Sequence, residues 1–207
     1  MQGKLEFLHG HFHESAAYVR LEALISSVAR EGMLAAEIGC FTGRTAFCAL
    51  PCVREHNGLM YLIDWFKGSG VGRIWPPRNQ TLGTLLDNLE TEGFLDHAII
   101  MVGNSIDAAK ALSREQILDY LYIGADHRYA QFSADVDTWW PRLKSGGVMC
   151  GHGLDRRIEK DGPEWQKCLD CCDVDWAAGV HWGIARLLAE RFPDYESEAN
   201  MWWVKKS

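Results

Sequence analysis

The sequence lacks an excess of basic residues. Of its 207 residues, 21 are Lys or Arg and 28 are Asp or Glu, so the formal net charge is -7. A protein that binds nucleic acid non-specifically is expected to carry a basic surface, and this charge balance disfavours that class. We therefore expect no nucleic-acid partner.

Long apolar runs and targeting signals are also missing. No apolar run approaches the ~20 residues that span a membrane, and the first 14 residues lack the basic-then-apolar order of a signal peptide. The seven cysteines are an odd number, and Cys40, Cys48 and Cys150 lie inside apolar segments. This pattern favours reduced, buried thiols over a disulfide framework. The sequence predicts a cytoplasmic protein with no membrane partner.

The dinucleotide fingerprint G-x-G-x-x-G is absent, and a different glycine turn follows the first predicted strand. Residues 34–38 read as a buried strand, G-C-F-T-G from Gly39 to Gly43 as a turn, and the residues from Arg44 as a helix. Such a unit brings backbone N–H groups to a nucleotide-like ligand. Glu37 favours a ligand with a cationic end. A nicotinamide-dependent oxidoreductase is the alternative, and the missing fingerprint disfavours it.

Buried strands alternate with helices along the whole chain, which predicts an α/β fold in one domain, residues 1–207. The predicted strands are 34–38, 59–63, 98–102, 118–123, 148–150 and 200–205; the main predicted helices are 14–30, 82–92, 106–112, 130–143 and 180–192. Near-continuous apolar strands separated by helices indicate a parallel sheet that is covered on both faces. The last strand is expected to add an antiparallel edge.

Polar residues follow successive strands of this predicted sheet. Asp64 follows the second strand, Asn104 the third, Asp126 and His127 the fourth, and His152 the fifth. Ligands of parallel sheets bind at the carboxyl ends of the strands, so these residues are expected along one rim. Asp64 is placed to accept hydrogen bonds from ribose hydroxyls, and a turn cap is its alternative role.

The composition of three segments outside this pattern suggests a role in binding or catalysis. Residues 65–81 contain glycines, two prolines and two tryptophans, and are predicted to form an active-site loop. Residues 1–33 form an N-terminal arm and helix; the arm, with His9, His11 and His13, is expected to cover the acceptor, and metal binding is the alternative. Cys168-x-x-Cys171-Cys172 has half of a zinc-site spacing, but no second pair accompanies it.

Several motifs occur in an order typical of a known family. They are E-I-G-C-F-T-G-R-T at 37–45, G-N-S at 103–105, I-G-A-D-H-R-Y at 123–129, L-K-S-G-G at 143–147, G-H-G at 151–153 and W-W-V-K-K at 202–206. The chain resembles the class I S-adenosylmethionine-dependent methyltransferases, and more closely a branch of small-molecule O-methyltransferases with the pattern I-D-G-D-H-x-Y, L-K-x-G-G and G-H-D. The resemblance implies a Rossmann-like, seven-stranded, mostly parallel sheet with helices on both faces and an antiparallel C-terminal edge strand.

The resemblance also implies roles for individual residues. The glycine turn would hold the methionine end of S-adenosylmethionine, with the Glu37 carboxylate near its ammonium group, and Asp64 would bind the ribose. Asn104 and Ser105 would border the adenine. The full set of cofactor residues that it implies is Glu37, Gly39, Cys40, Phe41, Thr42, Gly43, Asp64, Trp65, Asn104, Ser105 and Gly124.

Two glycines depart from the family pattern. Gly124 stands where the family has its first aspartate after the fourth strand, often a magnesium ligand or catalytic carboxylate, and Gly153 replaces the acidic residue after G-H. Magnesium is usually held by carboxylates, so a family-type divalent metal site is doubtful and no metal ligands are assigned.

Methyl transfer from a sulfonium requires the acceptor to be positioned and its proton removed. We expect His127 or His152 to be the general base, with Asp126 orienting an imidazole. The acceptor is expected to be a small-molecule hydroxyl of the sugar, phenol or natural-product type. In the alternative roles, His127 caps the following helix and His152 packs against the fifth strand.

A cofactor-binding protein of the same fold without methyltransferase activity is the alternative function. The sequence leaves open whether the protein forms a homo-oligomer.

Overall fold

A computed structural model of the chain describes residues 15–67, 78–113, 117–174, 177 and 180–207. The predicted His-rich arm and most of the predicted loop at 65–81 lie outside these residues. The sequence also predicts that the helix at 106–112 is followed by a short helical segment at 113–117. Residues 114–116 of that segment lie outside the described residues as well.

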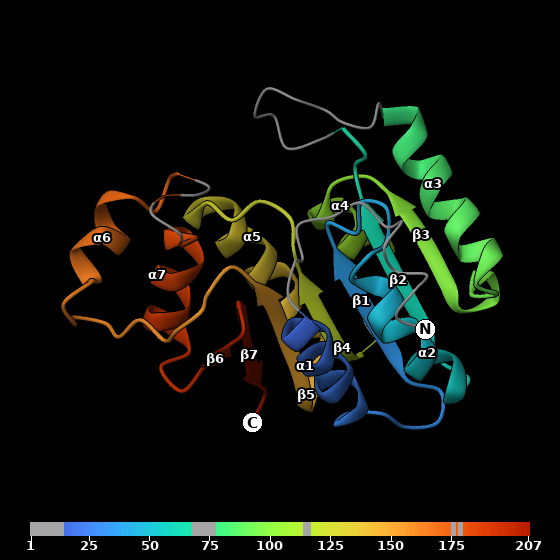
Figure 1. The fold of residues 1–207 in the computed structure, drawn as a ribbon, viewed down its shortest axis with the longest axis horizontal. Helices are drawn as coiled ribbons and strands as arrows, with labels where there is room; N and C mark the ends of the chain where they lie inside the picture. The colour runs from blue at the N-terminus through green and yellow to red at the C-terminus, as the bar shows by residue number, and fades with distance from the viewer. Residues whose placement is uncertain (1–14, 68–77, 114–116, 175–176, 178–179) are drawn as a thin grey trace.

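A single mixed sheet of seven strands organises the described chain (Figure 1). Its strands are β1 (Leu34–Ile38), β2 (Leu59–Asp64), β3 (Ala98–Val102), β4 (Leu118–Ile123), β5 (Leu143–His152), β6 (Glu196–Glu198) and β7 (Met201–Lys205). Their order across the sheet is β3-β2-β1-β4-β5-β7-β6. The first five strands pair in parallel, β7 is antiparallel to β5, and β6 is antiparallel to β7. The predicted fold class is confirmed.

Helices cover both faces of this sheet, and the alternation of buried residues along each strand decides which face they meet. α1 (Ser15–Ser26), α2 (Ala46–Glu55) and α3 (Arg78–Thr91) pack with Met60 and Leu62 of β2. α4 (Ser105–Ala111), α5 (Tyr129–Trp139) and α7 (Trp182–Arg191) pack on the other face with Tyr61 and Ile63. The short α6 (Trp165–Asp170) lies beside α7 at the β6 end of the sheet (Figure 1). None of the helices described here is long and apolar enough to cross a membrane.

Several predicted boundaries are wrong. The turn expected at 144–147 belongs to β5, which begins at Leu143 and whose register against β4 shifts between Leu118 and Tyr120. The sequence predicts that the helix from Arg44 ends or kinks near Pro51, but α2 continues through Pro51 to Glu55. The predicted loop 65–81 is shorter, because α3 begins at Arg78.

Asp119 joins three segments at the amino end of the sheet. Its side chain is fully buried near the start of β4, where it accepts hydrogen bonds from the Leu34 N–H (2.9 Å) and from Arg30 Nε (2.6 Å), and it forms an ion pair with Lys144. Burial raises the pKa of Asp119, but the hydrogen bonds from Arg30 and Lys144 outweigh it, and the pKa lies below its ordinary value of 3.8. The carboxylate therefore ties β1, β4 and β5 together where they begin.

We predict that Asp119→Ala lowers the free energy of unfolding by about 3 kcal/mol at pH 7, because it leaves a buried N–H and two cations without their acceptor. The folded-state pKa lies below the unfolded one, so this stabilisation is present above pH 3.8 and is lost as the pH falls through the folded value. Urea unfolding at several pH values measures it. Asp96→Ala, at an exposed residue, is the control and should change stability little. Equal effects of the two changes at pH 7 would contradict the role of Asp119.

Candidate functional site

The turn after β1 is pressed against the loop after β4. Gly39 has a φ of +84°, and a Cβ at this position would lie 2.8 Å from the Ala125 Cα and backbone N. Gly43 has a φ of +91°, and its Cβ would lie 2.6 Å from Leu85 Cδ1 in α3. Real Cβ contacts are longer, so both positions require glycine. The two glycines thereby set the path of the turn between β4 and α3.

Asp64, the last residue of β2, holds the middle of this turn. Its carboxylate accepts hydrogen bonds from the Phe41 N–H (2.9 Å) and the Phe66 N–H (2.6 Å). Burial raises the pKa of Asp64, and these two N–H groups act in the opposite direction. The turn-cap role is therefore observed. Each carboxylate oxygen accepts more than one hydrogen bond, so the cap leaves acceptor capacity for a ribose hydroxyl.

Glu37 is a buried carboxylate at the carboxyl end of β1. Its side chain is 1% exposed, and its Oε2 atom has no hydrogen-bond partner among the described residues. Burial raises the pKa of Glu37 well above 4.5, and the neighbouring Asp64 raises it further. An unpartnered buried carboxylate is costly, and a cationic group brought to it would remove that cost. Glu37 therefore fits the ammonium end of the cofactor that the sequence implies.

The other residues predicted beside the cofactor differ in exposure. Cys40 and Thr42 are buried in the turn, and Asn88 Nδ2 donates a hydrogen bond to the Thr42 carbonyl (3.3 Å). Trp65 is half exposed, and Lys67 Nζ lies 5.9 Å from the centre of its ring. Gly124 follows β4 immediately before Ala125. All of these residues lie at or beside the carboxyl ends of β1, β2 and β4.

Asn104 and Ser105 make local contacts at the start of α4. Asn104 caps this helix, because its side-chain oxygen accepts a hydrogen bond from the Asp107 N–H at 2.8 Å. The Ser105 hydroxyl donates to the buried carboxylate of Asp135 in α5. Burial raises the pKa of Asp135 to about 6. The sequence does not mark Asp135 as a buried residue, since one acidic residue in a predicted helix carries no signal of burial.

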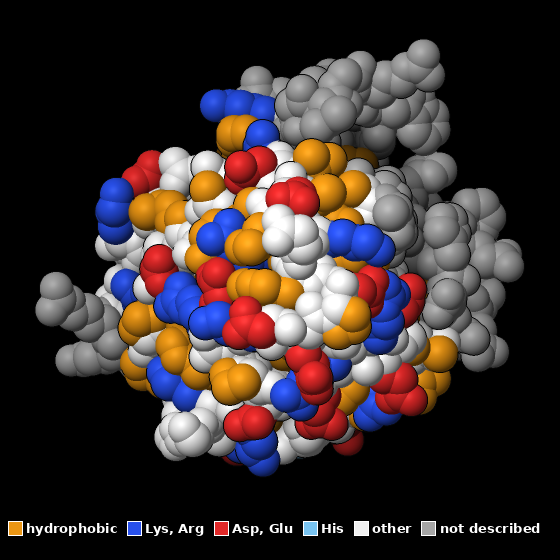
Figure 2. All heavy atoms as spheres, turned by 90° about the vertical axis from the view of Figure 1, so that its left-hand side faces the viewer, with side chains coloured by type: hydrophobic (Ala, Val, Ile, Leu, Met, Phe, Trp, Pro, Cys, Tyr) orange, Lys and Arg blue, Asp and Glu red, His pale blue; other side chains and the backbone are white. Residues whose placement is uncertain are grey.

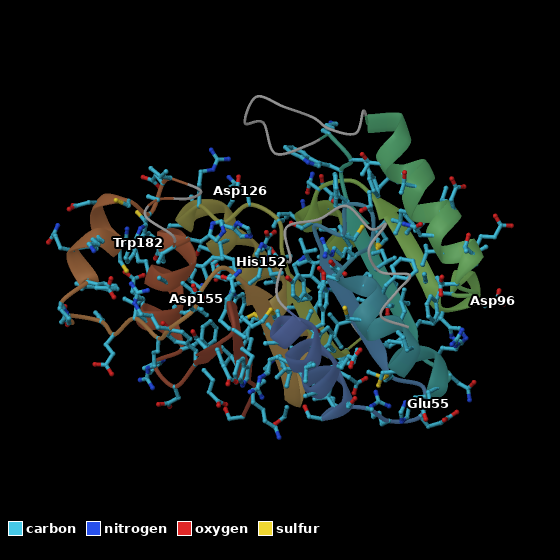
Figure 3. All side chains as sticks on the ribbon, viewed as in Figure 1. Glu55, Asp96, Asp126, His152, Asp155 and Trp182 are labelled. Carbon is cyan, nitrogen blue, oxygen red and sulfur yellow. The ribbon has the colours of Figure 1, made fainter. Side chains whose placement is uncertain are left out.

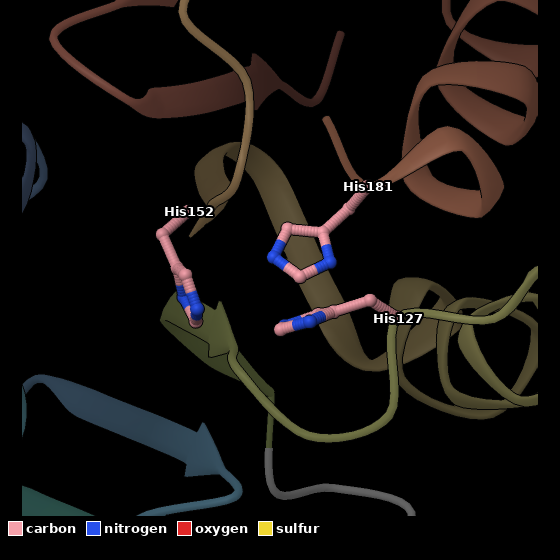
Figure 4. A group of neighbouring side chains, drawn as sticks. All are labelled: His127, His152 and His181. Carbon is pink, nitrogen blue, oxygen red and sulfur yellow. The ribbon is translucent and has the colours of Figure 1, made fainter. Parts of the chain in front are cut away.

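Three imidazoles converge at the end of β5 (Figure 4). His127 lies between β4 and α5, His152 ends β5, and His181 precedes α7. One ligand atom of each lies within 4.8 Å of the others. The His127 ring centre is 3.9 Å from that of His181 and 4.7 Å from that of His152. The sequence predicted His127 and His152 on one rim, but not His181.

Tyr122, which nothing in the sequence marks as a site residue, is hydrogen-bonded to one of these rings. The Tyr122 hydroxyl and His152 Nδ1 are 2.8 Å apart and share a hydrogen bond. Burial raises the pKa of Tyr122 well above 10, as does the nearby Glu37, so the phenol keeps its proton. When His152 carries its proton on Nδ1, it donates to the Tyr122 oxygen, and its Nε2 is the ring nitrogen that carries a lone pair.

Asp126 is engaged by its neighbour in the same loop. Its carboxylate accepts hydrogen bonds from the Arg128 N–H (3.0 Å) and Arg128 Nε (2.9 Å), and the two side chains form an ion pair. The Asp126 side chain is about one-third exposed. Figure 3 shows Asp126 and His152 far from Glu55 and Asp96, which precede β2 and β3 at the opposite edge of the sheet.

Rings fill the space beside both glycines that stand where the family pattern has carboxylates. A Cβ on Gly124 would lie 2.8 Å from Tyr122 Cε1, and a Cβ on Gly153 would lie 2.2 Å from His181 Cδ2. A carboxylate side chain fits at neither position without moving a ring. The described residues therefore do not fit the oxygen-ligated divalent site of that pattern.

The cysteines form no disulfide. All seven are free thiols, and Cys168 lies in α6 while Cys171 directly follows it. Cys172 Sγ accepts a hydrogen bond from Arg186 Nη1 at 3.2 Å. Burial raises the pKa of Cys168 to about 11, which disfavours the thiolate that zinc requires.

A family model described as a methyltransferase domain matches residues 36–154, which is 119 of the 207 residues. The match begins in β1 and ends just after β5, so it includes the glycine turn and two of the three imidazoles. No curated protein sequence matches the chain significantly.

Solved structures share the fold at low sequence identity. A Staphylococcus aureus protein provisionally named a caffeoyl-CoA O-methyltransferase has 13% identity and a TM-score of 0.64, over 100% of this chain and 90% of that one. Cofactor-bound Rv0187 from MTB has 14% identity and a TM-score of 0.62, over 99% and 86%. CalS11, a TDP-rhamnose 3'-O-methyltransferase, has 15% identity and a TM-score of 0.59, over 94% and 81%.

We predict that Glu37→Gln leaves the ligand-free protein as stable as the wild type, or more stable, at pH 8. The folded-state pKa of Glu37 is raised, so the folded wild type loses stability as the pH rises from 4.5 toward that value, and Gln removes this loss. Affinity for S-adenosylhomocysteine should fall about 10- to 100-fold, the equivalent of one charge-assisted hydrogen bond.

Thermal unfolding across pH and calorimetric titration measure these two effects. Glu55→Gln, at an exposed residue on the opposite edge of the sheet, is the matched control and should alter neither. A destabilised Glu37→Gln protein that binds the product normally would show that Glu37 is structural.

Proposed function

Because the chain belongs to the methyltransferase-domain family and is an S-adenosylmethionine-dependent methyltransferase, we propose that it methylates a hydroxyl oxygen of a small molecule, with His152 as the general base. The observation that carries this proposal is the distance between the cofactor turn and the imidazoles. Gly39 packs on Ala125, and a Cβ on the preceding Gly124 would lie 3.6 Å from His152 Cε1. The turn that we propose for the cofactor and the histidine that we propose as the base are thus one loop apart.

The turn residues bind and orient the cofactor in this proposal. S-adenosylmethionine, when bound, supplies a methyl group on a positively charged sulfur. Glu37 accepts hydrogen bonds from the ammonium group, and Asp64 accepts them from ribose hydroxyls. The carboxylates of Glu37 and Asp64 suit a cationic ligand and would repel a negatively charged phosphate group.

His152 takes the proton of the acceptor hydroxyl in this proposal. Its Nδ1 is held by Tyr122, which fixes the ring, and in the tautomer that carries the proton on Nδ1 the Nε2 atom accepts the acceptor's proton. Asp126, which the sequence predicted to orient an imidazole, forms an ion pair with Arg128 in the loop after β4. A base of this kind removes the need for an oxygen-ligated metal ion.

A small acceptor is supported by the surface and by the similar structures. Figure 2 shows Lys and Arg interspersed with Asp and Glu on the face at the α6 and α7 end, where no broad basic patch is drawn among the described side chains. Nucleic-acid binding would require such a patch. The similar structures include proteins named as O-methyltransferases, among them one that is named for TDP-rhamnose.

We predict that His152→Ala lowers kcat about 10²- to 10⁴-fold, the usual contribution of a general base, while affinity for S-adenosylhomocysteine changes little. Tyr122→Phe should lower kcat less, because the imidazole stays but loses the partner that orients it. Formation of S-adenosylhomocysteine with a panel of sugar nucleotides, phenols and other hydroxyl compounds measures the rates.

His97→Ala is the matched control, since His97 bonds the Gly58 carbonyl (3.0 Å) beside β3 and should leave turnover unchanged. Full turnover by His152→Ala would remove the base role. Product binding without turnover on any acceptor would instead favour a cofactor-binding protein.

A further inference from the structure

The three imidazoles at the end of β5 form a group that the proposed reaction does not use in full. A general base needs one ring, yet His127 and His181 lie against His152 from two other elements. His127 is 7% and His181 8% exposed, so both rings are buried at the rim. Three imidazoles from three separate elements therefore meet at one place on the rim.

Two further close contacts bring these rings together. A Cβ on Gly183, in the first turn of α7, would lie 2.4 Å from the His127 carbonyl oxygen and 2.4 Å from the Tyr129 N. A Cβ on Gly153 would lie 2.2 Å from the His181 ring, and the His181 N–H donates to the Gly153 carbonyl. Glycine at position 183 lets α7 approach the loop before α5, and glycine at position 153 lets the His181 ring lie against the end of β5.

The ligand atoms of the group are all imidazole nitrogens. Neutral imidazole suits zinc and other late divalent transition metals, whereas magnesium and calcium take oxygen ligands. Three protein nitrogens and one open position are the ligand set of a tetrahedral zinc site that accepts a water or substrate oxygen.

The spacing is close to that of such a site. Nitrogens at 2.0–2.1 Å from a tetrahedral zinc ion lie roughly 3.3 Å apart, and one ligand atom from each ring already lies within 4.8 Å of the others. Metal binding would bring these atoms closer by rotation of the side chains, and Figure 4 shows the three rings grouped at one place. Tyr122 supplies the outer hydrogen bond that commonly orients a metal-binding imidazole.

We propose that His127, His152 and His181 form a site for one divalent transition-metal ion of the zinc class. The ion binds a lone pair of each ring and has a fourth position open toward the rim. Binding itself is independent of the proposed reaction. Its effect on the reaction rests on the proposed function: a metal ion on His152 Nε2 occupies the lone pair that takes the acceptor's proton, so added zinc slows methyl transfer.

The experiment titrates Zn²⁺ by calorimetry into the purified full chain with His9→Ala, His11→Ala and His13→Ala, because imidazoles of the arm would also bind metal. One equivalent per chain is expected. Adding His181→Ala to this background should weaken binding by more than the roughly 10- to 100-fold that a change in an outer hydrogen bond causes. His97→Ala in the same background is the matched control and should leave binding unchanged.

Co²⁺ absorption identifies the ligands without any further variant, which keeps the proposal testable where His181→Ala fails to fold. Tetrahedral d–d bands without a thiolate charge-transfer band support the site. A thiolate band assigns the metal to the cysteines and overturns it, as does the absence of stoichiometric binding. Zinc that binds but accelerates methyl transfer supports the site and contradicts the base role of His152.

Discussion

The rest of the structure depends on the contact between the turn after β1 and the loop after β4. Gly39 and Ala125 touch through their backbones, and no residue with a side chain fits at position 39. Parallel pairing of β1 and β4 brings both segments to the same edge, but the absence of a Cβ allows them to meet. One contact thus sets how far Glu37 lies from the imidazoles. The site is built on β1 and β4, which are neighbours inside the sheet.

The buried carboxylates at the two ends of β1 and β4 differ in their hydrogen-bond partners and in the direction of their pKa shifts. At the amino end, Asp119 is surrounded by donors, its pKa is lowered, and it stabilises the sheet. At the carboxyl end, one Glu37 oxygen has no hydrogen-bond partner among the described residues, and the pKa of Glu37 is raised. Both carboxylates are buried within one sheet, but Glu37 has an oxygen that a ligand could bind. A buried carboxylate thus stabilises the fold at one end of the strands, and we propose that another binds the cofactor at the opposite end.

The sequence predicted the fold well because buried parallel strands are short apolar runs, and 34–38, 98–102 and 118–123 match the observed strands. It located Glu37, Asp64 and His152 because each lies at or beside the end of such a strand. It missed Tyr122, which looks like any apolar residue of β4, and His181, which reaches the site because α7 packs on α5 and its start lies against the loop after β4. The short β6 was also missed, since its three residues carry no apolar pattern. Contacts that depend on the packing of distant elements leave no local signal.

The order of strands at one side of the sheet has a consequence for how the protein assembles. β7 follows β6 along the chain, yet it is inserted between β5 and β6 and pairs His152 with Met201. A growing polypeptide therefore leaves the edge of β5, which ends in His152, without its antiparallel partner until residues 201–205 have been synthesised. Because β6 pairs only with β7, it also has no place in the sheet before then. Ordering of this side of the sheet is thus coupled by topology to the synthesis of β7.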